Sequence, residues 1–270
     1  MEWFEAVILG LIQGLTEFLP VSSSGHLEIG KVILGVQSTD DLMFTTMVHA
    51  ATVLSTIVVF RKQIFALLKG FFKFQYNDET DYLLKIAVSL VPIMIVGLFF
   101  KDHVEALFGS IKVVGVALFF TSALLFLSDI VSRPGKVASR AAAKDVRNGI
   151  SYWQAFLVGL GQALAVIPGL SRSGTTISTG LICGVRRDVI AQFSFLMVLI
   201  PILGESFLEL MGGEFASSSI GALPLALGFL SAFFSGLFAC KVMVALVKKA
   251  RLSWFAVYCL IAAAVVFIFS

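Results

Sequence analysis

The chain has 270 residues, of which 58% are hydrophobic and 14% charged, and its formal net charge is +3. Soluble domains are nearer half apolar and a quarter charged, so this composition excludes an ordinary soluble domain and indicates an integral membrane protein. The small net charge gives no reason to expect a nucleic-acid partner. Because the apolar runs are continuous and do not alternate, we exclude a transmembrane β-barrel and predict an all-α membrane protein.

The first apolar segment, residues 3–35, is interrupted in its middle by a short polar loop. Pro20 ends the first apolar piece, and a Ser-Ser-Ser-Gly run at 22–25 leads into the second. Each piece is shorter than the about 20 residues that an α-helix needs to cross a bilayer. We therefore predict a re-entrant helix–loop–helix hairpin over 3–35 instead of a full crossing.

Six longer segments are predicted to cross the membrane, three after each of two hairpins. The second predicted re-entrant hairpin covers residues 151–184 and is interrupted after Pro168 by a Ser-Arg-Ser-Gly turn. A polar stretch rich in Ala, Lys and Arg separates the two groups of segments. The six predicted spans lie near residues 41–60, 82–100, 111–131, 188–211, 220–247 and 252–269.

The two hairpins are copies of one sequence pattern. Residues 6–44, aligned without a gap on residues 155–193, are identical at 12 of 39 positions. We therefore divide the chain into repeat 1 (1–132), a linker (133–149) and repeat 2 (150–270). Each repeat has one hairpin and three spans, and because three is odd, the second repeat is inverted relative to the first. Paired interruptions in inverted repeats predict a binding site where the two loops meet.

Lysine and arginine are unevenly distributed between the two faces that six crossings define. Of the 20 lysines and arginines, fourteen fall on the face that holds the linker and three on the face that holds both termini. Positive residues favour the cytoplasmic side, so we predict a cytoplasmic linker and extracytoplasmic termini. Two full crossings in place of each hairpin would leave this parity unchanged, so the argument for hairpins rests on segment length.

Three polar residues near the first loop are candidates for a functional role. Two, Gln13 and Glu17, precede the loop, and His26 follows it. Gln13 and Glu17 are four residues apart and so share one face of a helix. A carboxylate at membrane depth is costly, which favours a polar role for Glu17. His26, three residues beyond Ser23, is a candidate general acid or base. His49 ranks lower, as a single polar residue in a predicted span.

Both loops have the composition of anion-binding sites. A Ser- and Gly-rich turn that opens a helix presents unpaired N–H groups, and the helix dipole favours negative charge there. The second loop adds Arg172, whose guanidinium can hold a phosphate through two hydrogen bonds. Facing each other, the loops suit a phosphate or diphosphate group at membrane depth, and hence a ligand with a lipid tail. The predicted substrate-binding residues are Ser22, Ser24, Gly25, Ser171, Arg172, Ser173, Gly174 and Thr175.

Three stretches resemble the signatures of one protein family. The pattern Q-x-x-x-E at 13–17, the run L-T-E-F-L-P-V-S-S-S-G-H at 15–26 and the run P-G-L-S-R-S-G at 168–174 look like those of the bacterial undecaprenyl-diphosphate phosphatases, the bacitracin-resistance proteins. The resemblance covers essentially the whole chain. It implies a bacterial inner-membrane enzyme that removes the terminal phosphate of undecaprenyl diphosphate and recycles the lipid carrier for peptidoglycan synthesis, at a site that opens to the extracytoplasmic side.

The resemblance also implies roles for individual residues. The family's acidic motif is Glu or Gln followed four residues later by Glu, so Gln13 and Glu17 are the predicted ligands of a divalent cation, Mg²⁺ or Ca²⁺. Arg172 is predicted to hold the diphosphate, and Ser23 to be the nucleophile with His26 as its acid or base. Direct attack by water, with His26 or Glu17 as the base, is an alternative. Outside this reaction class, a polyprenyl-phosphate flippase would need the same anion site without a nucleophile.

Overall fold

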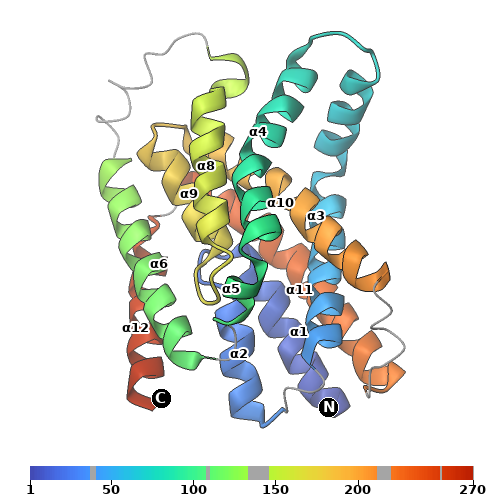
Figure 1. Cartoon of the computed structure of the whole chain (residues 1–270), viewed down its shortest axis with the longest axis vertical. Coiled ribbons are helices and arrows are strands. Elements are labelled where there is room, and N and C mark those ends of the chain that lie inside the picture. The colour runs from blue at the N-terminus through green and yellow to red at the C-terminus, as the bar shows by residue number, and fades with distance from the viewer. Residues whose placement is uncertain (37–40, 108–109, 133–145, 212–219, 250, 270) are drawn as a thin grey trace.

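The structure is a computed structural model of the whole chain, and it describes all residues except 37–40, 108–109, 133–145, 212–219, 250 and 270. Within the described residues, every regular element is a helix (Figure 1), as the sequence predicted. Most of the predicted linker, 133–149, lies outside the described residues. The helices are α1 (Trp3–Phe18), α2 (Ser23–Leu34), α3 (Asp41–Phe71), α4 (Asp78–Phe99), α5 (Lys101–Glu105), α6 (Ile111–Val131), the 3₁₀ helix η2 (Arg147–Gly149), α8 (Tyr152–Leu164), α9 (Arg172–Ile182), α10 (Arg187–Met211), α11 (Ala222–Lys249) and α12 (Ser253–Phe269).

Among the described residues, five helices are long and apolar enough to cross a bilayer. They are α3, α4, α6, α10 and α11. The helix α12 is equally apolar in character but has only 17 residues. Large apolar side chains cover the outer surface: Phe119, Phe120, Phe234 and Phe238 are each more than half exposed. Such a surface is stable only against another apolar phase, so the chain is a multi-pass membrane protein.

The helix α3 is longer than its predicted span. Hydropathy placed the end of this segment near residue 60, whereas α3 runs to Phe71. The added turns contain Arg61, Lys62 and Lys69. These charged residues end the apolar stretch but not the helix, because lysine and arginine are good helix formers. The next helix, α4, begins with Asn77 as its cap, whose side chain accepts the backbone N–H of Thr80 at 2.8 Å.

Two pairs of short helices interrupt the long ones. The helices α1 and α2 have 16 and 12 residues, and α8 and α9 have 13 and 11. Each is shorter than a bilayer crossing requires. A serine caps the second helix of each pair: Ser22 Oγ accepts the N–H of Gly25, and Ser171 Oγ accepts that of Gly174. The pairs therefore have the same local structure at matching positions of the two halves.

Each short pair packs on a long helix of the other half of the chain. Gly10 of α1 lies against α11, where an added Cβ would be 2.4 Å from the carbonyl oxygen of Gly228. Its counterpart in the repeat, Gly159 of α8, lies against α4, where a Cβ would be 2.2 Å from the carbonyl oxygen of Ser89. Contacts this close need glycine, because any side chain would push the backbones apart.

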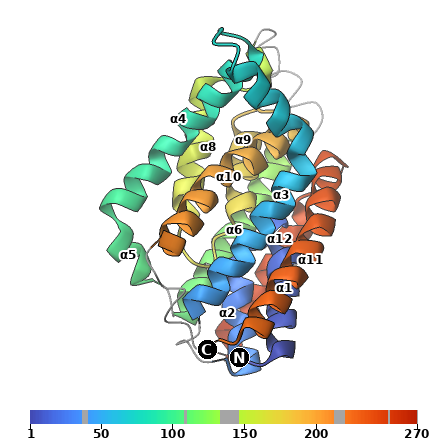
Figure 2. The ribbon, with the colours of Figure 1, turned by 90° about the vertical axis from the view of Figure 1, so that its right-hand side faces the viewer.

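The pairs enter the protein from opposite ends. In Figure 1, α1 and α2 lie in the lower half, where α1 starts and α12 ends, while α8 and α9 lie in the upper half. Figure 2 shows the same ends from the side, with the connection between α3 and α4 at the top. The loops between the helices of each pair therefore approach each other in the middle of the protein.

Replacing Gly159 by alanine should destabilise the protein, because the new methyl group would force α8 away from α4. Overpacking of this kind costs about 1–3 kcal/mol. The measurement is the unfolding temperature of the protein purified in detergent. Gly97→Ala is the matched control, since a Cβ at Gly97 of α4 meets no atom within 4 Å. Equal unfolding temperatures for the two variants would contradict the close packing of α8 on α4.

Candidate active site

The loops that follow α1 and α8 are joined by hydrogen bonds. Gly169 donates its backbone N–H to Ser24 Oγ at 3.4 Å, and Ser173 Oγ donates to the carbonyl oxygen of Leu19 at 3.0 Å. Polar loop atoms in the interior of a membrane protein need partners within the protein. Here each loop supplies partners to the other, which fixes their relative position.

Glu17, in the last turn of α1, accepts hydrogen bonds from the side chains around the first loop. Its Oε2 accepts hydrogen bonds from Ser23 Oγ at 2.6 Å and from Gln13 Nε2 at 2.8 Å. The side chain is only 10% exposed. Because α1 ends at Phe18 and α2 begins at Ser23, the chain reverses between them and brings the hydroxyl to the last turn of α1. The predicted nucleophile thus has a carboxylate as its hydrogen-bond acceptor.

A histidine from α3 approaches the same carboxylate. His49 Nε2 lies 3.8 Å from Glu17 Oε2, and His49 Nδ1 lies 2.9 Å from the carbonyl oxygen of Thr45. From the sequence alone, His49 ranks low because it is a single polar residue in an apolar segment. Its rarity was the available signal: the chain has only three histidines, and one of them is placed inside a helix long enough to cross a membrane.

Arg172 is the residue of the second loop that presents a charge to the first. It is the first residue of α9, and its guanidinium makes no hydrogen bond to any described residue. The cavity between the loops is lined by Glu17, Ser22, Ser23, Ser24, His49, Ala165, Leu170, Ser171 and Arg172. An unpaired guanidinium in a cavity with a buried carboxylate is suited to hold an anion.

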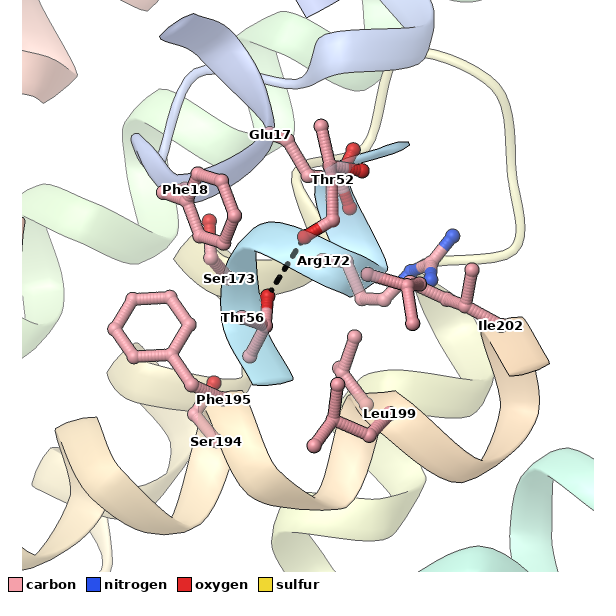
Figure 3. A pocket seen from close by; sticks show the side chains of 12 residues that line it. Glu17, Phe18, Thr52, Thr56, Arg172, Ser173, Ser194, Phe195, Leu199 and Ile202 are labelled. Carbon is pink, nitrogen blue, oxygen red and sulfur yellow. Dashed lines mark hydrogen bonds between the residues drawn. The ribbon is translucent and has the colours of Figure 1, made fainter. Parts of the chain in front are cut away.

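A second pocket adjoins this cavity and shares Glu17 and Arg172 with it (Figure 3). Its walls come largely from α3 and α10 and are mostly apolar. The lining includes Phe18, Phe195, Leu199 and Ile202, together with Thr52 and Thr56. The Thr56 hydroxyl donates to the carbonyl oxygen of Thr52. Glu17 and Arg172 therefore lie at the boundary between a polar and an apolar compartment.

Several predicted substrate-binding groups are engaged in building the loops. The N–H groups of Gly25 and Gly174 donate to the capping serines, and Thr175 Oγ1 donates to the carbonyl oxygen of Ser171 at 2.7 Å. Ser171 also donates its own N–H to Thr121 Oγ1 of α6. These residues shape the cavity, while Arg172 is the group on this loop with hydrogen-bonding capacity left for a ligand.

The structure does not bring His26 to Ser23. The His26 Nδ1 atom lies 2.7 Å from the carbonyl oxygen of Ser22, and its Nε2 lies 2.7 Å from the hydroxyl of Tyr258 on α12. The two rings are also stacked, with centroids 5.5 Å apart. Both ring nitrogens are therefore engaged away from the serine hydroxyl, and His26 does not line the cavity that contains Ser23.

The residues predicted to hold a divalent cation fit such an ion. Glu17 provides carboxylate oxygens, and Gln13 is fully buried with an Oε1 that has no hydrogen-bond partner among the described residues. A buried polar atom without a partner is costly, and a cation would satisfy it. Within the described residues, no group of three or more His, Cys, Asp or Glu side chains forms a metal site. The donors at hand are oxygen atoms, which suit Mg²⁺ or Ca²⁺.

The fold and the cavity together define a helical, multi-pass membrane protein with a buried polar site between two loops. Residues 6–265 match the model of the family described as bacitracin resistance protein BacA, and the chain belongs to this family.

Related proteins match over nearly their full length. An undecaprenyl-diphosphatase from Bacteroides thetaiotaomicron is 53% identical, over 99% of this chain and 99% of its own. One from Parabacteroides distasonis is 52% identical, over 97% and 96% of the two chains, and one from Korarchaeum cryptofilum is 38% identical, over 97% of each. All three bear the name of a hydrolase, so the comparisons give no support to the predicted alternative of a flippase.

Inorganic pyrophosphate should stabilise the wild-type protein and have little effect on Arg172→Ala, because the unpaired guanidinium is the main positive group in the cavity. A ligand at one hundred times its dissociation constant stabilises by about 2.7 kcal/mol. The measurement is the unfolding temperature with increasing pyrophosphate. Arg186→Ala is the control, because Arg186 is exposed and paired with Asp188. The same shift in Arg172→Ala as in wild type would exclude Arg172 as the anion-binding group.

Proposed function

We propose that this protein hydrolyses undecaprenyl diphosphate to undecaprenyl phosphate and inorganic phosphate, recycling the lipid carrier for cell-wall synthesis. The main support is the 53% identity, over 99% of both chains, to a protein named undecaprenyl-diphosphatase. The cavity supplies the groups that this reaction needs. The Ser23 hydroxyl is hydrogen-bonded to the Glu17 carboxylate, and the guanidinium of Arg172 is unpaired. A phosphoryl transfer needs mainly positioning and neutralisation of charge.

In the proposed reaction, Arg172 binds the diphosphate and Ser23 attacks the terminal phosphorus. The Ser23 proton passes to the carboxylate of Glu17, which already accepts the hydrogen bond from this hydroxyl. The bond between the terminal phosphorus and the bridging oxygen breaks, and undecaprenyl phosphate leaves. Water then hydrolyses the phosphoserine and releases inorganic phosphate. A divalent cation, Mg²⁺ or Ca²⁺, held by Glu17 and Gln13 would neutralise negative charge on the diphosphate.

The base in this proposal differs from the one that the sequence suggested. His26 was the predicted partner of Ser23, but its two ring nitrogens are engaged with Ser22 and Tyr258. Glu17 is the group at hydrogen-bonding distance, so we assign the base role to it. Direct attack by water, with Glu17 as the base, is the alternative within the same reaction.

We further propose that the membrane is crossed six times, by the five long helices and α12, and that the two short pairs are re-entrant. The helix α12 has 17 residues, which is at the lower limit for a span. The start of α1 and the end of α12 lie at one end of the protein, opposite the connection between α3 and α4 (Figure 1). The excess of lysine and arginine favours the latter end as cytoplasmic. The cavity would then open to the outer face of the bacterial inner membrane.

Ser23→Ala should bind substrate and lose hydrolysis by at least about a thousandfold, because it removes the nucleophile and leaves Arg172 in place. The measurements are substrate binding and single-turnover phosphate release by protein purified in detergent. Ser235→Ala is the matched control, since this serine of α11 donates its hydroxyl to the carbonyl oxygen of Ser231 in its own helix and does not contact Glu17. Equal rates for the two serine variants would remove the nucleophile and leave attack by water. A stronger loss in His26→Ala than in Glu17→Gln would return the base role to His26.

The topology can be tested by cysteine labelling in spheroplasts with a maleimide that does not cross membranes. In a background without the three native cysteines, His103→Cys should be labelled from outside and Arg140→Cys only after the membrane is opened. The reason is the distribution of positive charge, which favours the cytoplasmic side for residue 140. Labelling at residue 140 and not at residue 103 would invert the arrangement and contradict an outward-opening site.

A further inference from the structure

The proposed cation site has too few ligands from Glu17 and Gln13 alone. The Gln13 side chain is neutral, so the pair supplies one negative charge. Cations that bind through protein side chains usually have three or more protein donors, unless waters or phosphates complete the shell. A further donor in the cavity would complete the site without substrate. Apart from Glu17, the lining has one carboxylate or imidazole side chain, that of His49.

The hydrogen bond at one nitrogen of His49 fixes what the other nitrogen can do. Thr45 contributes a carbonyl oxygen, which lies 2.9 Å from His49 Nδ1. A carbonyl can only accept, so Nδ1 must carry the hydrogen that it donates. In the neutral ring, Nε2 therefore presents a lone pair, and it faces Glu17 Oε2. An imidazole whose second nitrogen is held by a carbonyl is the usual arrangement of a metal-ligating histidine.

The separation of the two atoms suits a shared ion. His49 Nε2 and Glu17 Oε2 are 3.8 Å apart. This separation is longer than a hydrogen bond. Metal–ligand bonds of about 2.1–2.4 Å place two ligands of one ion roughly 3–4.5 Å from each other. Two electron-pair donors at this distance can therefore bind one cation with little movement of either side chain.

The buried amide of Gln13 provides the independent observation. Its Nε2 donates to Glu17 Oε2, while Oε1, attached to the same carbon, has no partner among the described residues. A half-turn of the amide exchanges the two atoms and points the oxygen toward Glu17, where a cation would bind it. The residue is fully buried. Water from the surface therefore does not relieve the cost of the unpaired oxygen.

We propose that His49 is the third protein ligand of the cation, together with Glu17 and Gln13. The inference rests on the proposed function only for the location of the cation. One imidazole nitrogen beside two oxygens favours a divalent transition metal such as Mn²⁺ over Ca²⁺, because Ca²⁺ binds almost entirely through oxygen. The ion in this chain would thus differ from the Mg²⁺ or Ca²⁺ that the oxygen donors alone suggest.

The test uses Mn²⁺ as the probe and does not depend on activity. Protein purified in detergent is loaded with one equivalent of Mn²⁺, and electron spin-echo modulation detects a directly bound ¹⁴N nucleus. Wild type should show imidazole nitrogen coupling, and His49→Ala and His49→Gln should lose it. His26→Ala and His103→Ala are the matched controls and should keep it, since these are the other two histidines of the chain. The Mn²⁺ affinity, measured from the signal of the free ion, should fall at least about tenfold in His49→Ala.

The outcomes are distinct. Nitrogen coupling that persists in a monodisperse His49→Gln protein, or is absent in wild type, would overturn the assignment. An ion pair between a protonated His49 and Glu17 predicts that absence. The substitution to glutamine keeps a polar side chain in the helix, which guards against misfolding of the alanine variant. If the His49 variants lose the nitrogen coupling but the wild-type protein releases no phosphate from undecaprenyl diphosphate, the proposed function is refuted and the metal site is supported.

Discussion

Two helix-breaking loops exist in the interior of this membrane protein because each satisfies hydrogen-bonding groups of the other. The bond from Gly169 to Ser24 and the bond from Ser173 to Leu19 join them directly. Irregular backbone away from water is tolerated only where the protein supplies such partners. The mutual contact fixes the distance between the loops, and the cavity between them is its consequence.

The same contact explains why the two copies of the pattern carry different side chains. The first pair of short helices contributes the hydroxyl of Ser23 and the carboxylate of Glu17, and the second pair contributes the guanidinium of Arg172. The guanidinium and the hydrogen-bonded pair of Ser23 and Glu17 therefore come from different copies of the pattern. The close packing of α1 on α11 and of α8 on α4 links each loop to the opposite half, so the site forms only when the two halves assemble.

The elements that depend on local sequence could be predicted. Continuous apolar runs indicated the long helices, and Pro20 and Pro168 with the serine turns indicated the short pairs, because hydropathy and helix caps act within a few residues. The charged extension of α3 was missed, since loss of hydropathy marks the end of an apolar segment and not the end of a helix.

Contacts between segments that are distant in the sequence could not be predicted from local sequence. The orientation of His26 depends on Tyr258, which lies 232 residues away, and the approach of His49 to Glu17 depends on how α3 packs beside α1. The repeat pattern did indicate that the two loops would meet, because matched interruptions in an inverted pair converge by symmetry.

The central claim is that the chain cleaves the phosphoanhydride bond of its lipid substrate at this site. The most direct test is the reaction of purified protein with undecaprenyl diphosphate in water enriched in ¹⁸O, with analysis of both products. Attack on the terminal phosphorus should yield one inorganic phosphate for each molecule of undecaprenyl phosphate, with the label in the inorganic phosphate. Release of pyrophosphate, label in the lipid product, or no turnover would contradict it.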